Sequence, residues 1–596
     1  MTEFSRLSVA EIAEAVAAGR RSAASVARLV LDRVAAYEAV QPQVWIECAA
    51  EADVLAQAEA IDRRVAAGET LPLAGVPFAV KDNIDAAGLS TTAACPAFAY
   101  APQESASVVA RLLGAGALLI GKTNLDQFAT GLVGARSPYG ACASVYNRDY
   151  ISGGSSSGSA VAVAAGLAAF ALGTDTAGSG RVPAAFNHLV GLKPTKGRWS
   201  TRGVVPACRT LDCVSVLTSS ADDAARVDAV LAGFDAADPY SRRAPEAPPA
   251  PLAAAFRLGV PRADQLVFLG DDQSARLFEA AVARVVRMGG QVVEVDIAPL
   301  LAAAQLLYQG PWVAERTAAV EGLLRARPGV IEPTVRAILQ GGLAITAVEA
   351  FKAEYRLREH QRDAEALWAA ADVLLLPTAP TTYRLREVMA EPLALNSNLG
   401  LYTNFVNLLD MSAIAVPAGF RDNATGFGVT LIGPAWADRA LLELARRYEE
   451  IAPMPETPPL DLEGVKPGVK LAVVGAHLAA MPLHWQLTSR SAKLVRRCKT
   501  APAYKLYAMA GTVPPKPALV HVGAGGAAIE VEVYELAVEA FGSFVAEVPA
   551  PLAIGTVSLD DGTEVKGFVA EPRALDGAED ITALGGWRAY IARQSL

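Results

Sequence analysis

The stretch SGGSSSGSAVAVAAGLAAFALGTDTAGSGRVP (152–183) decides the fold. Two loops of glycine and serine enclose an alanine-rich segment that suits a buried helix followed by a strand. Loops with so few large side chains let backbone N–H groups converge on a ligand, and glycine tolerates backbone angles that other residues avoid. A flexible linker is the alternative, but both loops adjoin strongly apolar segments rather than polar spacers. The stretch therefore favours two ligand-binding loops inside a folded domain.

The surrounding sequence predicts an α/β domain with a mixed or mostly parallel sheet. Apolar runs bounded by glycine or proline, LAGVPFAVKD (73–82), ALLIGKTNL (117–125) and AAFALGTDTAG (168–178), are typical of buried strands. A helical segment, SVVARLLGAG (107–116), lies between the first two. Strands that alternate with helices in this way indicate a sheet covered by helices. Before them we expect one helix capped by Ser8 and closed by Gly19, and a longer one over 22–40.

The length and one proline-rich segment predict two domains. A chain of 596 residues exceeds the roughly 250 to 300 residues at which a single core stops growing. Residues 452–468, APMPETPPLDLEGVKPG, carry five prolines among seventeen residues, which is typical of a stiff linker. We therefore predict one domain over 1–452, a linker over 453–468 and a smaller α+β domain over 469–596. A hairpin is expected in the last of these, where a DDG turn (560–562) separates two apolar runs.

Composition limits the partners. A formal charge of −9 gives no broad electrostatic surface for nucleic acid or anionic membrane, so a small-molecule substrate is expected. Mean hydropathy is +0.28, but the excess comes from alanine-rich runs such as 161–173 that are too short to span a bilayer. The acidic N-terminus does not resemble a secretory signal. Six scattered cysteines without metal-ligand spacing predict reduced structural thiols, no metal and a cytoplasmic protein.

Three kinds of chemistry compete for the glycine–serine loops. A phosphate-binding loop would need a GxxxxGK[ST] motif, and neither loop has the lysine. A nucleophile elbow is formally present as Gly154–Gly158, which would make Ser156 the nucleophile. That interpretation needs a preceding strand and a histidine partner, for which only His360 is plausible. The third possibility is a serine activated by a lysine.

Four motifs in order resemble the amidase signature family. They are GVPFAVKDNI (75–84), SGGSSSGSA (152–160), GTDTAGSGRVPAA (173–185) and VGLKPTKGR (190–198), and the resemblance covers roughly residues 20 to 440. It implies the amidase signature fold, a mixed β-sheet surrounded by helices, and a Ser–Ser–Lys triad without cofactor. By this resemblance the base is Lys81, the bridging serine is Ser155, which follows a cis peptide, and the nucleophile is Ser179.

The chemistry of such a triad is reasonable for these residues. A lysine near its ordinary pKa of about 10.4 cannot accept a proton, so Lys81 must be desolvated, and the apolar run before it suits that. The base would draw a proton through Ser155 from Ser179, which attacks an amide carbonyl. Backbone N–H groups of Thr176, Ala177, Gly178 and Ser179 are expected to hold the oxyanion. Taken alone, Lys81 would be read as an ordinary surface lysine.

Two departures from the general amidase signature motifs narrow the range of expected substrates. Ser157 stands where glycine is usual, and TAGSG replaces the commoner TGGSI; both variants resemble the allophanate hydrolase branch, as does KTNLDQFATGLVGARSPYG (122–140). In LYQGPWVAERTAA (307–319) the resemblance assigns substrate recognition to Tyr308 and Arg316, and to Gly131 more weakly. We expect Tyr308 in a loop and Arg316 in the second turn of a helix that begins at Pro311. Arginine suits the carboxylate of allophanate, whereas pairing with Glu315 on a solvated face is the alternative.

Residues 469–596 resemble the C-terminal domain of allophanate hydrolases, a γ-glutamylcyclotransferase-like fold. The resemblance implicates His477 in breakdown of N-carboxycarbamate, while His484 and His521 are expected to be structural. A role only in dimerisation is the alternative for this domain. For the whole chain we expect a homodimer that splits allophanate to ammonia and carbon dioxide, linked to a urea carboxylase or a biuret-producing hydrolase. Two hypotheses compete with this one: the chain is another amidase or an amidotransferase component, or it is a scaffold whose triad is vestigial.

Overall fold

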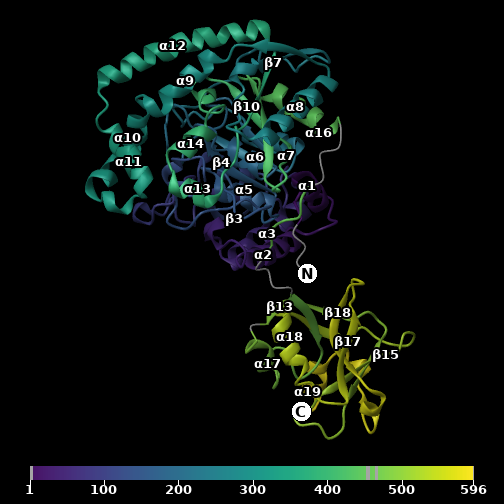
Figure 1. Ribbon diagram of the computed structural model, residues 1–596. Coiled ribbons are helices and arrows are strands. Elements are labelled where there is room, and N and C mark those ends of the chain that lie inside the picture. Colours follow the sequence, from purple (N-terminus) through teal and green to yellow (C-terminus); the bar gives the residue numbers. More distant parts are fainter. Residues whose placement is uncertain (1–4, 452–456, 463–467, 491, 595–596) are drawn as a thin grey trace. The chain divides into compact units, whose positions relative to one another are not determined.

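The computed structural model describes residues 5–451, 457–462, 468–490 and 492–594, which fall into two compact units divided between residues 463 and 464 (Figure 1). Each unit has its own hydrophobic core. Most of the predicted linker 453–468 lies outside the described residues. Its described residues, 457–462 and Gly468, include Asp461, whose N–H donates to the Val145 carbonyl (2.8 Å) and whose carboxylate pairs with Arg148 (3.2 Å). This segment is therefore bound to the larger unit.

The larger unit is built on a mixed, eleven-stranded sheet. Its strands, in spatial order, are β1 (Trp45–Cys48), β3 (Leu118–Thr123), β2 (Pro77–Lys81), β4 (Phe170–Asp175), β6 (Cys213–Thr218), β5 (Val190–Lys193), β10 (Ser412–Phe420), β11 (Gly426–Gly433), β9 (Val373–Pro377), β7 (Phe256–Pro261) and β8 (Gly290–Val295). Strand β2 runs parallel to β3 and β4, while β4 is antiparallel to β6. The sheet predicted from the sequence is confirmed as a mixed one.

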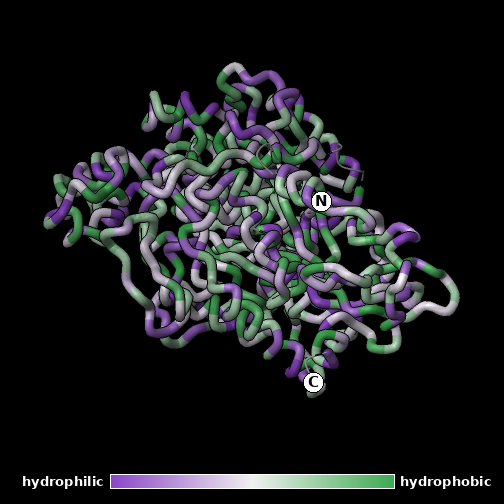
Figure 2. Tube along the Cα trace, turned by 90° about the horizontal axis from the view of Figure 1, so that it is seen from below, coloured by the Kyte–Doolittle hydropathy of each residue, from purple (hydrophilic) through white to green (hydrophobic). Residues whose placement is uncertain are grey.

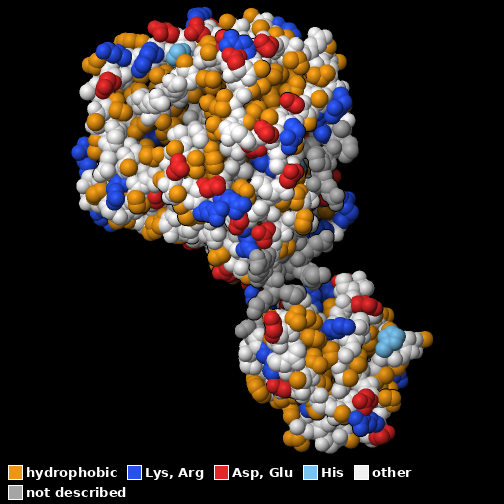
Figure 3. All heavy atoms as spheres, in the orientation of Figure 1, with side chains coloured by type: hydrophobic (Ala, Val, Ile, Leu, Met, Phe, Trp, Pro, Cys, Tyr) orange, Lys and Arg blue, Asp and Glu red, His pale blue; other side chains and the backbone are white. Residues whose placement is uncertain are grey.

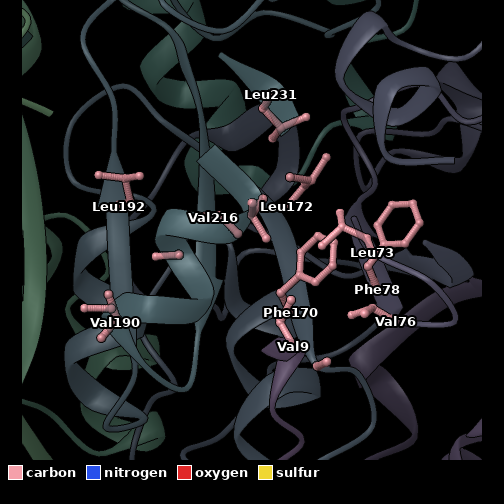
Figure 4. Close-up of a cluster of buried hydrophobic side chains, with 14 of the residues drawn as sticks. Val9, Leu73, Val76, Phe78, Phe170, Leu172, Val190, Leu192, Val216 and Leu231 are labelled. Atoms are coloured by element: carbon pink, nitrogen blue, oxygen red, sulfur yellow. The ribbon is translucent and has the colours of Figure 1, made fainter. Parts of the chain in front are cut away.

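The central strands are apolar on both faces because helices cover both sides. In β2 and β4 every residue is buried. Phe78 of β2 and Phe170 of β4 stack with ring centroids 5.4 Å apart, among the buried side chains drawn in Figure 4. Burial on both faces explains why these strands read as continuous apolar runs in the sequence. The same packing fixes the ends of β2 and β4, from which the site is built.

Helices enclose the sheet, and the first two begin where the sequence predicted. Ser8 caps α1 (Val9–Ala17) by accepting from the Glu11 N–H, and Ser22 caps α2 (Ala23–Tyr37). On the outer helices the trace alternates between hydrophilic and hydrophobic residues, as in amphipathic helices (Figure 2). The other helices are α3 (Glu51–Ala66), α4 (Ser107–Gly114), α5 (Ser157–Ala164), α6 (Arg181–Phe186), α7 (Ala221–Leu231), α8 (Asp272–Arg287), α9 (Ala298–Gln309), α10 (Trp312–Ala326), α11 (Pro333–Gly342), α12 (Ala347–Ala370), α13 (Leu385–Ala390), α14 (Ala394–Leu399), α15 (Phe405–Leu408) and α16 (Asp438–Glu450).

The smaller unit is an α+β structure with two sheets. One contains β13 (Lys493–Lys499), β16 (Glu530–Ala537), β12 (Gly468–Val473), β18 (Glu564–Ala570) and β17 (Leu552–Ser558), in that order. The other contains β15 (Pro517–His521), β14 (Tyr504–Ala508) and β19 (Glu579–Asp580). Strands β17 and β18 form the expected hairpin around the DDG turn. Helices α17 (Trp485–Thr488), α18 (Val538–Val545) and α19 (Trp587–Gln594) complete the unit.

Candidate active site

Lys81 is the last residue of β2 and has no solvent exposure. Its Nζ lies 2.8 Å from Ser155 Oγ and 2.7 Å from Thr174 Oγ1. Burial lowers the pKa of Lys81 to about 7, although Asp126, Asp175 and Asp212 act in the opposite direction. The surface-lysine interpretation is therefore wrong, because this amine is buried and close to the neutral form that a base requires.

The two serines lie on the loops that flank α5 and β4. The peptide bond between Gly154 and Ser155 is cis, as the resemblance implied. The side chains of Ser155 and Ser179, both described residues, are not hydrogen-bonded to each other: Ser179 Oγ donates to the Gly131 carbonyl (3.4 Å). The backbones are joined, since the Ser156 N–H donates to the Ser179 carbonyl (3.3 Å). Lysine and both serines are thus gathered at one place, with the Ser179 hydroxyl turned to Gly131.

The loop that carries Ser179 is held by a buried ion pair. The Asp175 carboxylate accepts from Arg181 Nε (2.9 Å) and from the N–H groups of Gly178 (2.9 Å) and Gly180 (3.1 Å). The Gly178 N–H is therefore occupied, although we expected it to help hold the oxyanion. Within this described loop the N–H groups of Thr176, Ala177 and Ser179 donate to no protein acceptor. These three are the donors available to an oxyanion.

A second carboxylate anchors the same loop from the other side. Asp212 accepts from Thr176 Oγ1 (2.5 Å) and from the N–H groups of Ala207 (2.8 Å) and Cys208 (3.1 Å). Burial raises the pKa of Asp212 to about 6. Sequence reasoning missed Asp212, Asp126 and Thr174. Thr174 and Asp175 stand inside the GTDTAG motif, whereas Asp126 and Asp212 become neighbours of the site only through the fold.

Arg316 and Tyr308 are adjacent, on consecutive helices. Arg316 lies in the second turn of α10, and its guanidinium stands 5.2 Å from the Tyr308 ring centroid. Tyr308 lies in the last turn of α9, so its predicted position in a loop is wrong. The apolar residues Leu306 and Leu307 extend the buried face of α9, and the helix stops only where Gly310 becomes extended.

The Arg316 guanidinium is buried and incompletely paired. Arg316 is 2% exposed, and NH1 donates to the Ala129 carbonyl and Thr130 Oγ1, both at 3.4 Å. Nε and NH2 have no hydrogen-bond partner. The alternative pairing with Glu315 is wrong, because the Glu315 carboxylate accepts from the N–H and hydroxyl of Thr210. The guanidinium, two of whose nitrogens are unsatisfied, is thus held at Ala129 and Thr130, and the next residue, Gly131, accepts from the Ser179 hydroxyl.

The nucleophile-elbow interpretation is also wrong. Ser156 is the residue before α5, no strand leads into it, and its hydroxyl donates to the Thr174 carbonyl (3.2 Å). His360 belongs to α12, and its Nδ1 has no hydrogen-bond partner. The Ser156 hydroxyl therefore stabilises β4 by a hydrogen bond and is not placed as a nucleophile.

In the smaller unit His477 packs among aromatic rings. Its ring stacks on Phe568 (centroids 5.0 Å apart), meets Phe544 edge-on, and its Nε2 lies 2.7 Å from Gln486 Oε1. Burial lowers the pKa of His477. His484 Nε2 lies 3.0 Å from the Tyr534 hydroxyl, and the His521 ring packs edge-on against Tyr504.

Other features of the described chain bear on cofactors and surroundings. All six cysteines are free thiols. Among the described residues no three His, Cys, Asp or Glu side chains gather in a metal-binding arrangement. None of the described helices is long and apolar enough to cross a membrane. Basic and acidic side chains are interspersed over the faces drawn in Figure 3.

The sequence matches two family models. Residues 28–442 match the Amidase model, so the chain belongs to the amidase family. Residues 469–592 match the allophanate hydrolase C-terminal domain. Both the amidase signature fold and the resemblance to allophanate hydrolases are confirmed by these matches.

Relatives and solved structures match this chain over different shares of its length. The allophanate hydrolase structure from Kluyveromyces lactis is 42% identical, covers 96% of this chain and 97% of its own, and superposes with a TM-score of 0.70. The urea amidolyase of Saccharomyces cerevisiae is 45% identical over 92% of this chain and 31% of its own length. This chain thus spans about a third of the urea amidolyases that it matches. One subunit of the glutamyl-tRNA(Gln) amidotransferase of Symbiobacterium thermophilum is 36% identical over 76% of this chain and 98% of its own.

Proposed function

We propose that the chain hydrolyses allophanate, a ureido carboxylate, at its amide C–N bond. The observation that carries the substrate assignment is the Arg316 guanidinium, buried beside Thr130 with Nε and NH2 unpaired. A buried guanidinium whose Nε and NH2 have no acceptor is incompletely satisfied, and a planar carboxylate supplies two acceptors to such a fork. The K. lactis allophanate hydrolase, alike over nearly its whole length, supports the same substrate.

The chemistry follows from the geometry around Lys81. Its neutral amine takes a proton from Ser155 while Ser155 takes the proton of Ser179, whose oxygen attacks the terminal amide carbonyl. The N–H groups of Thr176, Ala177 and Ser179 stabilise the oxyanion, each contributing about 3 to 4 kcal/mol. The proton returns to the leaving nitrogen, ammonia departs and an acyl-enzyme remains. Water, deprotonated by the same relay, then releases N-carboxycarbamate and frees Ser179.

The assay that tests this proposal follows ammonia released from allophanate, malonamate and a long-chain amide. Ser179→Ala should abolish turnover; allophanate cleaved at the parent rate would refute the triad. Arg316→Met should raise KM for the two carboxylates by about 100-fold or more, since a buried charge-assisted pair is lost. It should leave KM for the long-chain amide, which offers Arg316 no carboxylate, nearly unchanged. An equal rise in KM for all three substrates would refute the carboxylate role of Arg316. A parent protein that prefers the long-chain amide would favour a general amidase.

For the smaller unit we propose assistance to the decarboxylation of N-carboxycarbamate, with His477 as the acting group. The family match over 469–592 supports this role. A His477→Asn variant should release the first ammonia at the parent rate but accumulate N-carboxycarbamate, detectable by 13C NMR. If His477→Asn gives the same ratio of ammonia to N-carboxycarbamate as the parent, the smaller unit has a role in assembly alone.

We further propose that the protein is a cytoplasmic homodimer that acts after a urea-carboxylating or a biuret-producing enzyme. Free thiols support a reducing compartment, and the urea amidolyase relatives support the link to urea carboxylation. The dimer is supported by an exposed stripe on α12, formed by Val348, Phe351 and Tyr355, each about two-thirds exposed. Phe351→Glu should then yield monomers in light scattering; a monomeric parent protein would refute the dimer.

A further inference from the structure

Asp126 lies at the centre of the loops that build the site. Its carboxylate is fully buried and accepts from the N–H groups of Val133 (3.2 Å) and Gly134 (3.0 Å) through Oδ2, and of Arg136 (2.9 Å) through Oδ1. Its own N–H donates to the Ser155 carbonyl (3.2 Å). One residue thus ties the segment that follows Gly131 to the serine that bridges the triad.

The same carboxylate explains two glycines. A Cβ at Gly131 would lie 2.6 Å from Asp126 Oδ2, and a Cβ at Gly154 would clash with the same oxygen. Gly131 provides the carbonyl that accepts from Ser179, and Gly154 precedes Ser155. Both glycines are therefore needed so that Asp126 can approach the backbone of these loops.

Asp126 is also close to the base, because the residue that accepts from its N–H, Ser155, has its hydroxyl 2.8 Å from Lys81 Nζ. Asp126, ahead of Asp175 and Asp212, favours the protonated form of Lys81, whereas Arg316 disfavours it. All three hydrogen bonds to the Asp126 carboxylate come from N–H donors, which is the pattern of an ionised acid. Burial raises the pKa of Asp126, while Arg136 lowers it.

We propose that Asp126 is a positioning residue of the catalytic centre: it holds the segment that follows Gly131 and the Ser155 backbone in place, and its negative charge keeps the base Lys81 from losing its proton too readily. A base that is too weak would not accept the Ser179 proton, so this charge matches Lys81 to a reaction near neutral pH. The inference deepens the proposed function but depends only on the triad.

The test measures how fast Ser179 reacts with a small fluorophosphonate as the pH varies, read by intact-mass spectrometry. The Ser179 oxygen bonds to phosphorus and fluoride leaves, while the serine proton passes to Lys81 through Ser155. The rate therefore reports the titration of the base without any allophanate. For Asp126→Asn we expect the midpoint of the profile to fall by about one pH unit, because an attractive negative charge is removed. The plateau rate should fall about tenfold as the loops loosen.

Asp228→Asn is the matched control. Asp228 is also a buried carboxylate, bonded to Trp199 Nε1 (2.9 Å) and Arg198, but it is not among the principal charges acting on Lys81. Its variant should keep the parent midpoint. An unchanged midpoint in Asp126→Asn, whatever the plateau, would overturn the charge role.

Folding of the variants is checked by circular dichroism. If Asp126→Asn does not fold, Asp126→Ser removes the same charge and leaves room for a water that accepts from the same N–H groups. Failure of both variants to fold, with Asp228→Asn intact, would assign Asp126 to folding alone and refute the proposal. If Ser179 is labelled normally but allophanate is not cleaved, the substrate assignment fails while this inference stands.

Discussion

At the scale of the residue, the site depends on a lysine that the fold keeps from being fully charged. Lys81 has no exposed surface, and its pKa falls to about 7 because burial disfavours the ammonium ion. The sequence predicted Lys81, Ser155 and Ser179 as site residues because each belongs to a recognisable motif, and the structure brings the three together. It was not sufficient for Asp126 or Asp212, because their roles arise from contacts between loops distant in sequence.

The first prediction at this scale is a pH profile. The base must be neutral, so kcat/KM should rise with pH through a midpoint of about 7 and level off above it. Measuring initial rates of ammonia release from pH 5.5 to 9 checks this. A midpoint near 10 would mean that the Lys81 amine is solvated.

A second prediction concerns stability. The folded-state pKa of Lys81 is depressed, so between about pH 7 and 10 the unfolded chain binds more protons and the native state gains stability as the pH rises. Lys81→Met removes this cost of burying an ammonium. We expect the variant to melt above the parent at pH 7, with the difference shrinking toward pH 10 in calorimetric scans. A variant less stable than the parent at every pH would contradict this.

At the scale of the element, the sheet brings the reacting groups together. Strands β2 and β4 are parallel neighbours, so Lys81 and Asp175 lie at the same end of the sheet. Periodicity and flanking glycines predicted these strands and the first two helices. The position of Tyr308 in a loop was mispredicted, because Gly310 and Pro311 mark the start of α10 without showing that another helix, α9, runs up to Gln309.

The nucleophile loop tolerates only glycine at position 178. Gly178 has φ of +123°, and a Cβ there would clash with Thr403 Oγ1. Gly178→Ala should therefore displace the neighbouring N–H donors and lower kcat by about 100-fold or more. Steady-state rates check this, together with a melting curve to show that the variant is folded. A kcat within twofold of the parent would contradict it.

A cap far from the site should affect stability alone. Ser8→Ala removes the acceptor for the Glu11 N–H at the start of α1, which should cost about 1 kcal/mol of unfolding free energy. The variant's kcat and KM should equal those of the parent. Urea titration gives the free energy, and an altered kcat would show an unforeseen link between α1 and the site.

At the scale of the whole molecule, two units with separate cores form the chain. Composition predicted the division from five prolines, but it could not predict that Asp461 within that segment binds Arg148 and Val145 of the larger unit. A fragment ending at residue 463 should therefore be more stable than one ending at 456. The difference in unfolding free energy should be about 1 kcal/mol, and the longer fragment should melt at the higher temperature. Calorimetry of both fragments checks this. Equal stability would show that the Asp461 contacts contribute nothing.

The place of Lys81 in the sheet also bears on how the enzyme would be inactivated. Strand β2 lies between β3 and β4, away from any edge, and every residue in it is buried. Amide hydrogens in such a strand exchange with solvent only when the whole unit opens. Denaturant should therefore abolish catalysis along the same curve as it unfolds the larger unit, with no concentration at which a folded but inactive enzyme accumulates.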